Sequence, residues 1–210
     1  HKYIGDPINA IRIFNDKEVD ELVFLDIQAS IKKQPPNYQM LADIASECFM
    51  PLCYGGGIKS LKDIEKILYT GVEKVSINSS AFENPDLIRE AAKEFGSSTI
   101  VVSIDVKRTI LSGYKVFTKS GKFNTKKDPV VYAREMEDLG AGELLINAVD
   151  ADGTMAGYNI NLVSKITESV GIPVIACGGA GSINDMHDVV HQANSSAVAA
   201  GSFFVFQGKH

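Results

Sequence analysis

Two aspartates that close apolar runs are the first candidates for proton transfer. Asp105 ends the run IVVSID, and Asp26 ends LVFLD in the same manner. A carboxyl at a strand end, held against apolar walls, has the raised pKa that suits a general acid or base. The alternative for Asp105 is a carboxylate that pairs with Lys107 or Arg108 and orients a loop. For Asp26 the alternative is support of neighbouring groups.

Two glycine-rich turns are candidates for anion binding. Each precedes a helix and a strand that ends in small residues, so backbone N–H groups and the helix dipole could both favour a negative charge. Ordinary tight turns, and an Asx turn at Asp152, are the alternatives. The earlier site would use Gly57, Asn78 and Ser79, and the later one would use Gly179, Gly201 and Ser202, with Asp152 and Gly153 beside it.

Three charged residues stand at the opposite ends of predicted strands. Glu21, Lys74 and Glu143 each begin a strand, and these strands alternate along the chain. Side chains from alternate strands share an interior layer in a parallel barrel, so the three could meet at its floor. The cluster is either a stabilising ring of salt bridges or a gate, because buried charges are costly unless they are paired.

The remaining polar residues give little support for a metal or cofactor. His187 and His191 lie four residues apart, but HDVVH lacks the glutamate of a metalloprotease motif. The three cysteines form no CxxC pair, which favours a reduced, cytoplasmic protein. The net charge of −5 argues against nucleic acid as a partner, and no apolar run is long enough to span a membrane. We expect no metal and no cofactor.

An internal repeat positions these residues. Residues 51–82 align without a gap on residues 173–204, at a constant offset of 173 − 51 = 122. The alignment matches the Gly-Gly turns and the two capping serines, Ser60 and Ser182. A period this long indicates two half-domains that fold alike, and not a solenoid.

Short apolar runs alternate with helical patterns along the whole chain, which is typical of βαβ units and a parallel sheet. The predicted strands are Leu22–Ile27, Pro51–Tyr54, Lys74–Asn78, Thr99–Asp105, Glu143–Asp150, Pro173–Cys177 and Ser196–Ala200. The predicted helices are Pro7–Phe14, Tyr38–Cys48, Leu61–Tyr69, Pro85–Phe95, Pro129–Leu139, Leu162–Val170 and Ile183–Gln192.

Several local signals refine these elements. Asp6-Pro7, Asn84-Pro85 and Asp128-Pro129 each place a capping side chain before a proline, which predicts three helix starts. The alternating residues Tyr114–Thr118 and the turn after them predict a hairpin inserted after the fourth strand. The tail from Phe203 predicts the start of a last helix.

Seven parallel strands with a twofold repeat predict a (β/α)₈ TIM barrel that lacks one strand, and residues 1–210 form a single domain in this interpretation. The repeat arithmetic places the missing strand before His1, so we expect a first strand and its loop to precede this chain, and part of the last helix to follow His210. An open, doubly wound sheet of seven strands is the alternative fold.

The ordered motifs resemble one family closely, the cyclase subunit of imidazole glycerol phosphate synthase, or HisF family. The resemblance covers essentially the whole chain. It rests on DELVFLDI, YGGGI, EKVSINSSAFENP, SIDVKR, VFTKSGKFNT, GAGELLINAVDADGTMAGYN, CGGAG and AAGSFF.

The resemblance implies a lyase of histidine biosynthesis. Ammonia reacts with a formimino aminoimidazole carboxamide ribonucleotide that carries a phosphate at each end, and the products are imidazole glycerol phosphate and an aminoimidazole carboxamide ribotide. It also implies a heterodimer with a HisH-like glutaminase subunit that supplies the ammonia.

The same resemblance implies residue functions. Two aspartates transfer protons in the family; one matches Asp105, and the other lies on the first strand and matches nothing here. Asp26 and Ser120 match positions near the substrate. The residues that match the two phosphate sites are Gly57, Asn78, Ser79, Asp152, Gly153, Gly179, Gly201 and Ser202, and those that match an ammonia gate are Glu21, Lys74 and Glu143.

Ala151 departs from the family motif DRDGT, which has arginine at this position. This departure keeps an alternative open: HisF-like paralogues resemble enzymes that amidinate sugars of surface polysaccharides. A silent barrel that only binds a glutaminase is a third possibility. The sister isomerase of histidine synthesis is disfavoured, because it does not need the charged floor.

Overall fold

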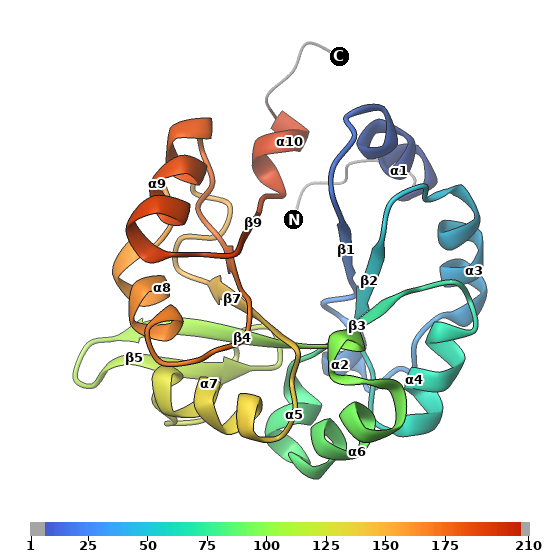
Figure 1. The fold of residues 1–210 in the computed structure, drawn as a ribbon, viewed down its shortest axis with the longest axis horizontal. Helices are drawn as coiled ribbons and strands as arrows, with labels where there is room; N and C mark the ends of the chain where they lie inside the picture. Colours follow the sequence, from blue (N-terminus) through green and yellow to red (C-terminus); the bar gives the residue numbers. More distant parts are fainter. Residues whose placement is uncertain (1–6, 207–210) are drawn as a thin grey trace.

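The computed structural model describes residues 7–206 and shows a curled sheet of seven parallel strands ringed by helices (Figure 1). The strands follow one another in chain order round the sheet, which is the order of a (β/α)₈ barrel. The barrel prediction is confirmed, and the doubly wound alternative is wrong. The strands are β1 (Leu22–Leu25), β2 (Leu52–Gly55), β3 (Lys74–Ile77), β4 (Ile100–Thr109), β7 (Glu143–Ala148), β8 (Val174–Cys177) and β9 (Ala197–Ala199).

The long helices lie outside the sheet and cover its outer face (Figure 1). Their apolar sides pack on the strands, and residues such as Ile64, Ile88 and Ile166 are fully buried there. The long helices are α1 (Pro7–Asp16), α3 (Tyr38–Glu47), α4 (Leu61–Leu68), α6 (Asp86–Phe95), α7 (Pro129–Asp138), α8 (Ile160–Thr167) and α9 (Ile183–Ala193); the short ones are α2 (Ala29–Lys32), α5 (Ser79–Glu83), the 3₁₀ helix η1 (Ser97–Thr99) and α10 (Ser202–Phe206).

The ring is closed by helices where the strands leave it open. Among the described residues, β1 and β9 are not paired with each other. Figure 1 shows α10 in the opening between them, and Phe204 of α10 meets Phe14 of α1 edge to face, with ring centroids 6.2 Å apart. The start of the predicted last helix is therefore present as α10, and the rest of that prediction falls outside the described residues.

The two halves of the repeat have the same secondary structure at the same offset. Strand β2 begins at Leu52 and β8 at Val174, while α4 begins at Leu61 and α9 at Ile183. Each pair of starts differs by 122 positions, which is the offset of the sequence alignment. The repeat therefore places both Gly-Gly turns at the same level of the barrel.

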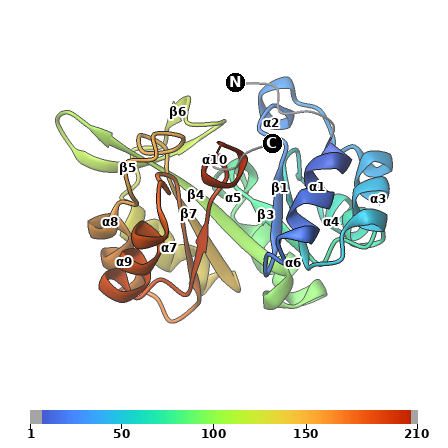
Figure 2. The same cartoon turned by 90° about the horizontal axis from the view of Figure 1, so that it is seen from above.

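The inserted hairpin differs from its prediction. Strand β4 does not end at Asp105 but continues to Thr109, because its last residues pair antiparallel with β5 (Gly113–Thr118). Strand β5 pairs in turn with β6 (Phe123–Asn124) across the predicted turn. Figure 2 shows β5 and β6 projecting beyond the body of the barrel, beside its carboxyl-terminal rim.

Of the three predicted caps before proline, one is confirmed. Asp128 accepts hydrogen bonds from the N–H groups of Val130 and Val131 at the start of α7. The prediction of a cap at Asn84 is wrong, because α6 begins at Asp86 after Pro85 and has no side-chain cap. Asp6 lies outside the described residues.

Side chains that point into the barrel form layers between its floor and its rim. Cys53, Val101 and Leu145 make a small apolar cluster inside the ring of strands, separate from the large core between strands and helices. The lumen is therefore filled by side chains, with charged residues below this cluster and polar residues above it.

Candidate functional site

Asp105 lies in the mouth of the barrel, at the point where β4 leaves the wall to enter the hairpin. Its side chain is only 9% exposed, and its Oδ1 accepts a hydrogen bond of 2.9 Å from Nδ2 of Asn147. Burial raises the pKa of Asp105, and the charge of Asp152 adds to this rise, although the hydrogen bond from Asn147 and the charge of Lys107 oppose it. A carboxyl that holds its proton to a higher pH can act as a general acid as well as a base.

The first glycine turn follows β2 (Leu52–Gly55), at the same rim of the barrel. Gly57 has φ of +72°, and a Cβ atom there would lie 2.6 Å from the carbonyl oxygen of Gln34, so only glycine fits. At the end of β3, Asn78 donates from Nδ2 to the carbonyl of Ser103 over 3.0 Å, and Ser79 accepts from the backbone of Lys119 over 3.1 Å. The predicted residues Asn78 and Ser79 thus link β3 to its neighbouring strand and to the hairpin.

The second glycine turn forms a recess with the loop after β7. The five residues predicted for the later anion site all line it, so the structure brings together residues up to 202 − 152 = 50 positions apart in sequence. Small residues dominate the lining, which leaves backbone N–H groups open to a ligand. The recess is lined by Asp152, Gly153, Cys177, Gly178, Gly179, Ala180, Ala199, Ala200, Gly201 and Ser202.

Asp26 and Ser120 hold the loops at the mouth. Oδ1 of Asp26 accepts hydrogen bonds of 3.0 Å from the N–H groups of Gln28 and Ala29, at the start of the short helix α2. Ser120 donates to the carbonyl of Ile27 over 2.6 Å and so connects the hairpin to the loop after β1. These are the contacts of a residue that supports neighbouring groups, the alternative given for Asp26; the position of Asp26 near a substrate stays a prediction.

The three charged residues at the strand starts meet at the floor. Nζ of Lys74 lies 2.8 Å from Oε2 of Glu21 and 2.8 Å from Oε1 of Glu143. Burial alone would lower the pKa of Lys74, but the hydrogen bonds that Lys74 donates to Glu143 and Glu21 outweigh it and raise that pKa. The ammonium is therefore charged and shared by two carboxylates, below the apolar layer that contains Cys53.

Two polar residues of the lumen were missed in the sequence. Asn147 contacts Asp105, and the hydroxyl of Ser76 is buried with no hydrogen-bond partner in the described structure. Both point into the barrel. Ser76 lies two residues after Lys74 and Asn147 four residues after Glu143, so each faces the same side of its strand as the inward-pointing floor residue. The sequence did contain a signal for them. Counting every second residue along a strand from its floor residue gives the residues of that strand that face the lumen.

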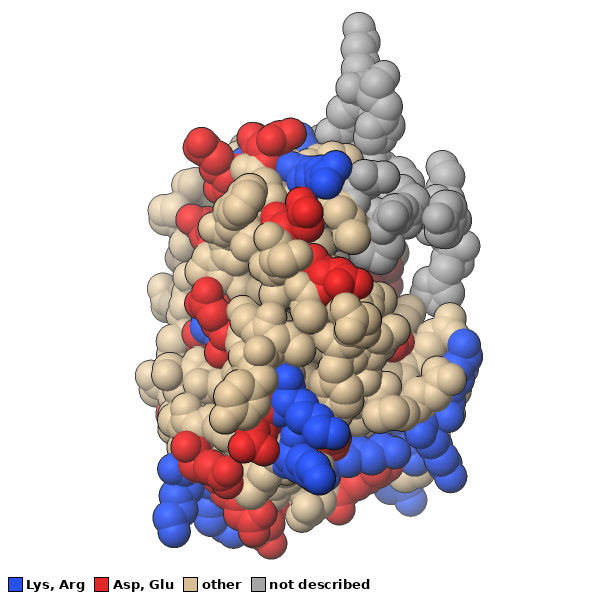
Figure 3. All heavy atoms as spheres, turned by 90° about the vertical axis from the view of Figure 1, so that its right-hand side faces the viewer, with Lys and Arg blue, Asp and Glu red and all other residues tan. Residues whose placement is uncertain are grey.

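No group of metal-ligating side chains is found between residues 7 and 206, and none of the helices there is long and apolar enough to cross a membrane. The rings of His187 and His191 stack with centroids 3.9 Å apart on the exposed side of α9. On the face that covers α1, α3 and α4, acidic and basic side chains are both present and neither kind covers the surface (Figure 3).

Comparison with known proteins places the chain among enzymes of histidine biosynthesis. The family model described as "Histidine biosynthesis protein" matches residues 1–210. The chain is 54% identical over 209 residues to the protein of Pseudomonas aeruginosa named "Putative imidazole glycerol phosphate synthase subunit hisF2", with all of this chain and 83% of that protein covered.

Two further relatives carry the same subunit name. The imidazole glycerol phosphate synthase subunit HisF of Sulfolobus acidocaldarius is 48% identical over 199 residues, which are 95% of this chain and 79% of the relative. The HisF subunit of Alkaliphilus metalliredigens is 41% identical over 203 residues, which are 97% of this chain and 81% of the relative. The chain belongs to the histidine biosynthesis protein family, among its imidazole glycerol phosphate synthase HisF subunits.

Proposed function

We propose that this protein is the cyclase subunit of imidazole glycerol phosphate synthase. It uses ammonia to convert a bis-phosphate formimino aminoimidazole carboxamide ribonucleotide into imidazole glycerol phosphate and aminoimidazole carboxamide ribotide. The observation that carries this proposal is the position of Asp105, a buried carboxyl of raised pKa in a mouth bordered by two glycine turns. No observation favours the alternative of sugar amidination.

In this proposal the two turns bind the two phosphates. Gly57, Asn78 and Ser79 bind one of them, and the recess that contains Gly179 and Ser202 binds the other. Asp26 and Ser120 keep the loop after β1 and the hairpin in place. A substrate held at both ends lies across the mouth, so that its reacting atoms pass over Asp105 and lose their freedom to rotate.

Asp105 then gives and takes the protons of ring closure. Asn147 donates a hydrogen bond to one oxygen of its carboxyl, and the side chain of Asn78 also hydrogen-bonds this carboxyl, so both amides orient it toward the substrate. A second acid or base is required, and we propose that it is the first-strand aspartate implied by the family resemblance. Experiments on catalysis should therefore use the full-length protein.

Turnover of the bis-phosphate substrate with an ammonium salt tests this proposal. Replacement of Asp105 by Asn should lower kcat by at least about 10²-fold, because general acid–base groups contribute about 10²–10⁴-fold. Asp138→Asn, which removes an exposed carboxylate from α7, is the matched control and should leave turnover unchanged. Equal rates for the Asp105 variant and the control would overturn the proposal.

We further propose that a glutaminase subunit docks on the floor and delivers ammonia past Lys74. Two exposed aromatic residues support this, since Phe49 is 87% exposed in the loop before β2 and Tyr69 is 84% exposed in the loop before β3. Exposed aromatic side chains beside a charged cluster are typical of protein interfaces. The pair Lys74–Glu143 lies between such a partner and the lumen.

The variants Phe49→Ala and Lys74→Met separate docking from delivery. Phe49→Ala should weaken binding of the glutaminase by about tenfold, which corresponds to about 1.4 kcal/mol. Lys74→Met should keep that binding but change the glutamine-dependent rate relative to the ammonium-dependent rate. If both variants bind the glutaminase normally and show an unchanged ratio of the two rates, the floor is not the route.

A further inference from the structure

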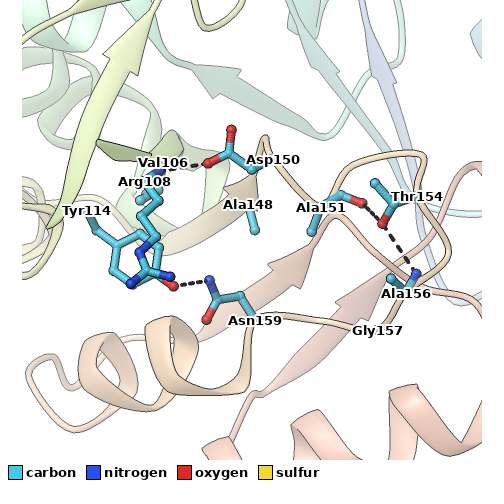
Figure 4. A pocket seen from close by; sticks show the side chains of 10 residues that line it. All are labelled: Val106, Arg108, Tyr114, Ala148, Asp150, Ala151, Thr154, Ala156, Gly157 and Asn159. Carbon is cyan, nitrogen blue, oxygen red and sulfur yellow. Dashed lines mark hydrogen bonds between the residues drawn. The ribbon is translucent and has the colours of Figure 1, made fainter. Parts of the chain in front are cut away.

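A second cavity lies behind the strand wall, on the side away from Asp105. In the register of β4 and β7, Asp105 pairs with Asn147, and the next residues, Val106 and Ala148, pair with each other. Adjacent residues of a strand point to opposite faces, so the first pair faces the mouth and the second faces outward. Val106 and Ala148 form the apolar base of this outer cavity, which Figure 4 shows from close by.

One end of the outer cavity is rich in hydrogen-bond donors. Figure 4 shows the guanidinium of Arg108, the hydroxyl of Tyr114 and the amide of Asn159 gathered there. Nδ2 of Asn159 donates to the Tyr114 hydroxyl over 2.7 Å, so the proton of that hydroxyl remains available for a ligand. No carboxylate of the described residues forms a salt bridge with Arg108.

The cavity also carries a negative charge, next to the backbone of Arg108. Oδ2 of Asp150 accepts a hydrogen bond of 2.7 Å from the backbone N–H of Arg108, which fixes the carboxylate at the edge of the cavity. Ala151 and Ala156 line the part of the cavity that lies beyond Asp150 from Tyr114 (Figure 4), and these short side chains leave room for a small molecule. The cavity thus has a cationic group, an anionic group close to it and an apolar base.

We propose that the outer cavity binds a free amino acid. A guanidinium matches a carboxylate through two parallel hydrogen bonds, so Arg108 receives the carboxylate with Tyr114 beside it. Asp150 receives the ammonium. The carboxylate of Asp150 also disfavours phosphate, because a dianion would be repelled by it. An amino acid, whose carboxylate and ammonium are close together, satisfies both charged groups, whereas a simple acid or a simple amine satisfies one.

Binding in this cavity has a local reporter in the backbone. Gly157 lines the cavity, and its N–H donates to the carbonyl of Gly179 over 2.8 Å. The NMR signal of this amide will therefore shift when the cavity is occupied. The reporter does not depend on catalysis, and the inference does not depend on the proposed cyclase function.

The experiment is an NMR titration of the full-length protein with each of the common amino acids, with acetate and ethylamine as probes of a single charge. At least one amino acid should shift the Gly157 amide in a saturable way with Kd below about 10 mM, and acetate and ethylamine should bind at least about tenfold more weakly. No saturable shift with any amino acid, or acetate binding as tightly as the best amino acid, would overturn the proposal.

Two variants and a control locate the site. Arg108→Gln removes the cation and Ala151→Leu fills the cavity, and each should weaken binding of the best amino acid at least about tenfold. Arg89→Gln, which removes an exposed arginine of α6, should bind as the wild type does. The melting temperature of each variant shows that it is folded. Binding that survives both cavity variants lies elsewhere and contradicts the proposal.

Discussion

Asp105 shows how the surroundings of one side chain decide its chemistry. Burial disfavours the charged carboxylate, and the nearby negative charge of Asp152 does so too. The amide of Asn147 and the ammonium of Lys107 favour the charged form, but their effect is smaller than that of burial. The balance raises the pKa of Asp105, and it means that this carboxylate reduces the stability of the folded protein at neutral pH.

We predict that Asp105→Asn stabilises the fold at pH 7 while it abolishes turnover. The folded pKa lies above the ordinary value of 3.8, so ionisation of Asp105 costs stability above its folded pKa, and that cost is absent below pH 3.8. Urea unfolding of both proteins at pH 7 and near pH 3.5 measures the difference. A variant that is less stable than the wild type at pH 7 would contradict the prediction.

Gly179 and Gly201 both line the recess at the second glycine turn, and they provide a matched pair for a test of backbone strain. A Cβ on Gly179 would lie 2.0 Å from the carbonyl oxygen of Gly157, and φ is +107°, whereas a Cβ on Gly201 would meet no atom within 4 Å. We predict that Gly179→Ala lowers the free energy of unfolding by about 1–3 kcal/mol or more through backbone strain. Gly201→Ala should stay within about 0.5 kcal/mol of the wild type. Equal melting temperatures for the two variants would show that the turn can relax.

At the scale of the element, the repeat preserves its helix caps. Oγ of Ser60 accepts from the N–H of Asp63 at the start of α4, and Oγ of Ser182 accepts from the N–H of Asp185 at the start of α9, each over 3.2 Å. The first cap has more bonds, because Asp63 also accepts from the hydroxyl of Tyr38 over 2.9 Å.

We predict that Ser182→Ala costs about 1 kcal/mol of stability, the usual value for the loss of an N-cap, and that Ser60→Ala costs more. The additional loss at Ser60 arises because its hydroxyl also donates to Oδ2 of Asp63 over 2.9 Å. Chemical denaturation of the two variants gives both values. The ranking is wrong if Ser182→Ala proves the more destabilising change.

The sequence predicted elements well where the signal was local. Periodicity located all seven parallel strands and the seven long helices, with ends that differ by a few residues. It missed α2 and α5, because each is about one turn long and forms where side chains such as Asp26 fix a loop. It also ended β4 too early, since the residues after Asp105 become strand only through pairing with β5.

At the scale of the whole molecule, the duplication places the two proposed anion sites at one rim of the barrel. We predict that the bis-phosphate substrate raises the melting temperature more than imidazole glycerol phosphate at the same concentration, because ligand stabilisation grows with affinity and the substrate occupies both sites. Ser202→Asp should reduce the difference between the two melting-temperature shifts, because it places a negative charge in the recess at the second glycine turn. Equal shifts for the two ligands would argue that one of the sites is not used.

Much of the candidate site was predictable because the carboxyl ends of parallel strands share one rim. Gly179 and Ser202 could be placed together from the repeat alone, and the structure brings them into one recess. The partner of Asp105 could not be named, because which neighbour reaches the carboxyl depends on the register of β4 and β7. The outer cavity was not foreseen, since its walls come from a hairpin whose path the sequence does not specify.

Asp105 is paired on both sides, with Asn147 of β7 in the wall and with Phe117 of β5 in the hairpin. A peptide unit gripped by two neighbouring strands has little freedom to shift during a reaction cycle. Asp105 therefore keeps its position during the reaction, and the substrate must be brought to it. Any opening and closing that turnover requires belongs to the surrounding loops, so changes in loop length should alter the speed of product release while proton transfer itself stays the same.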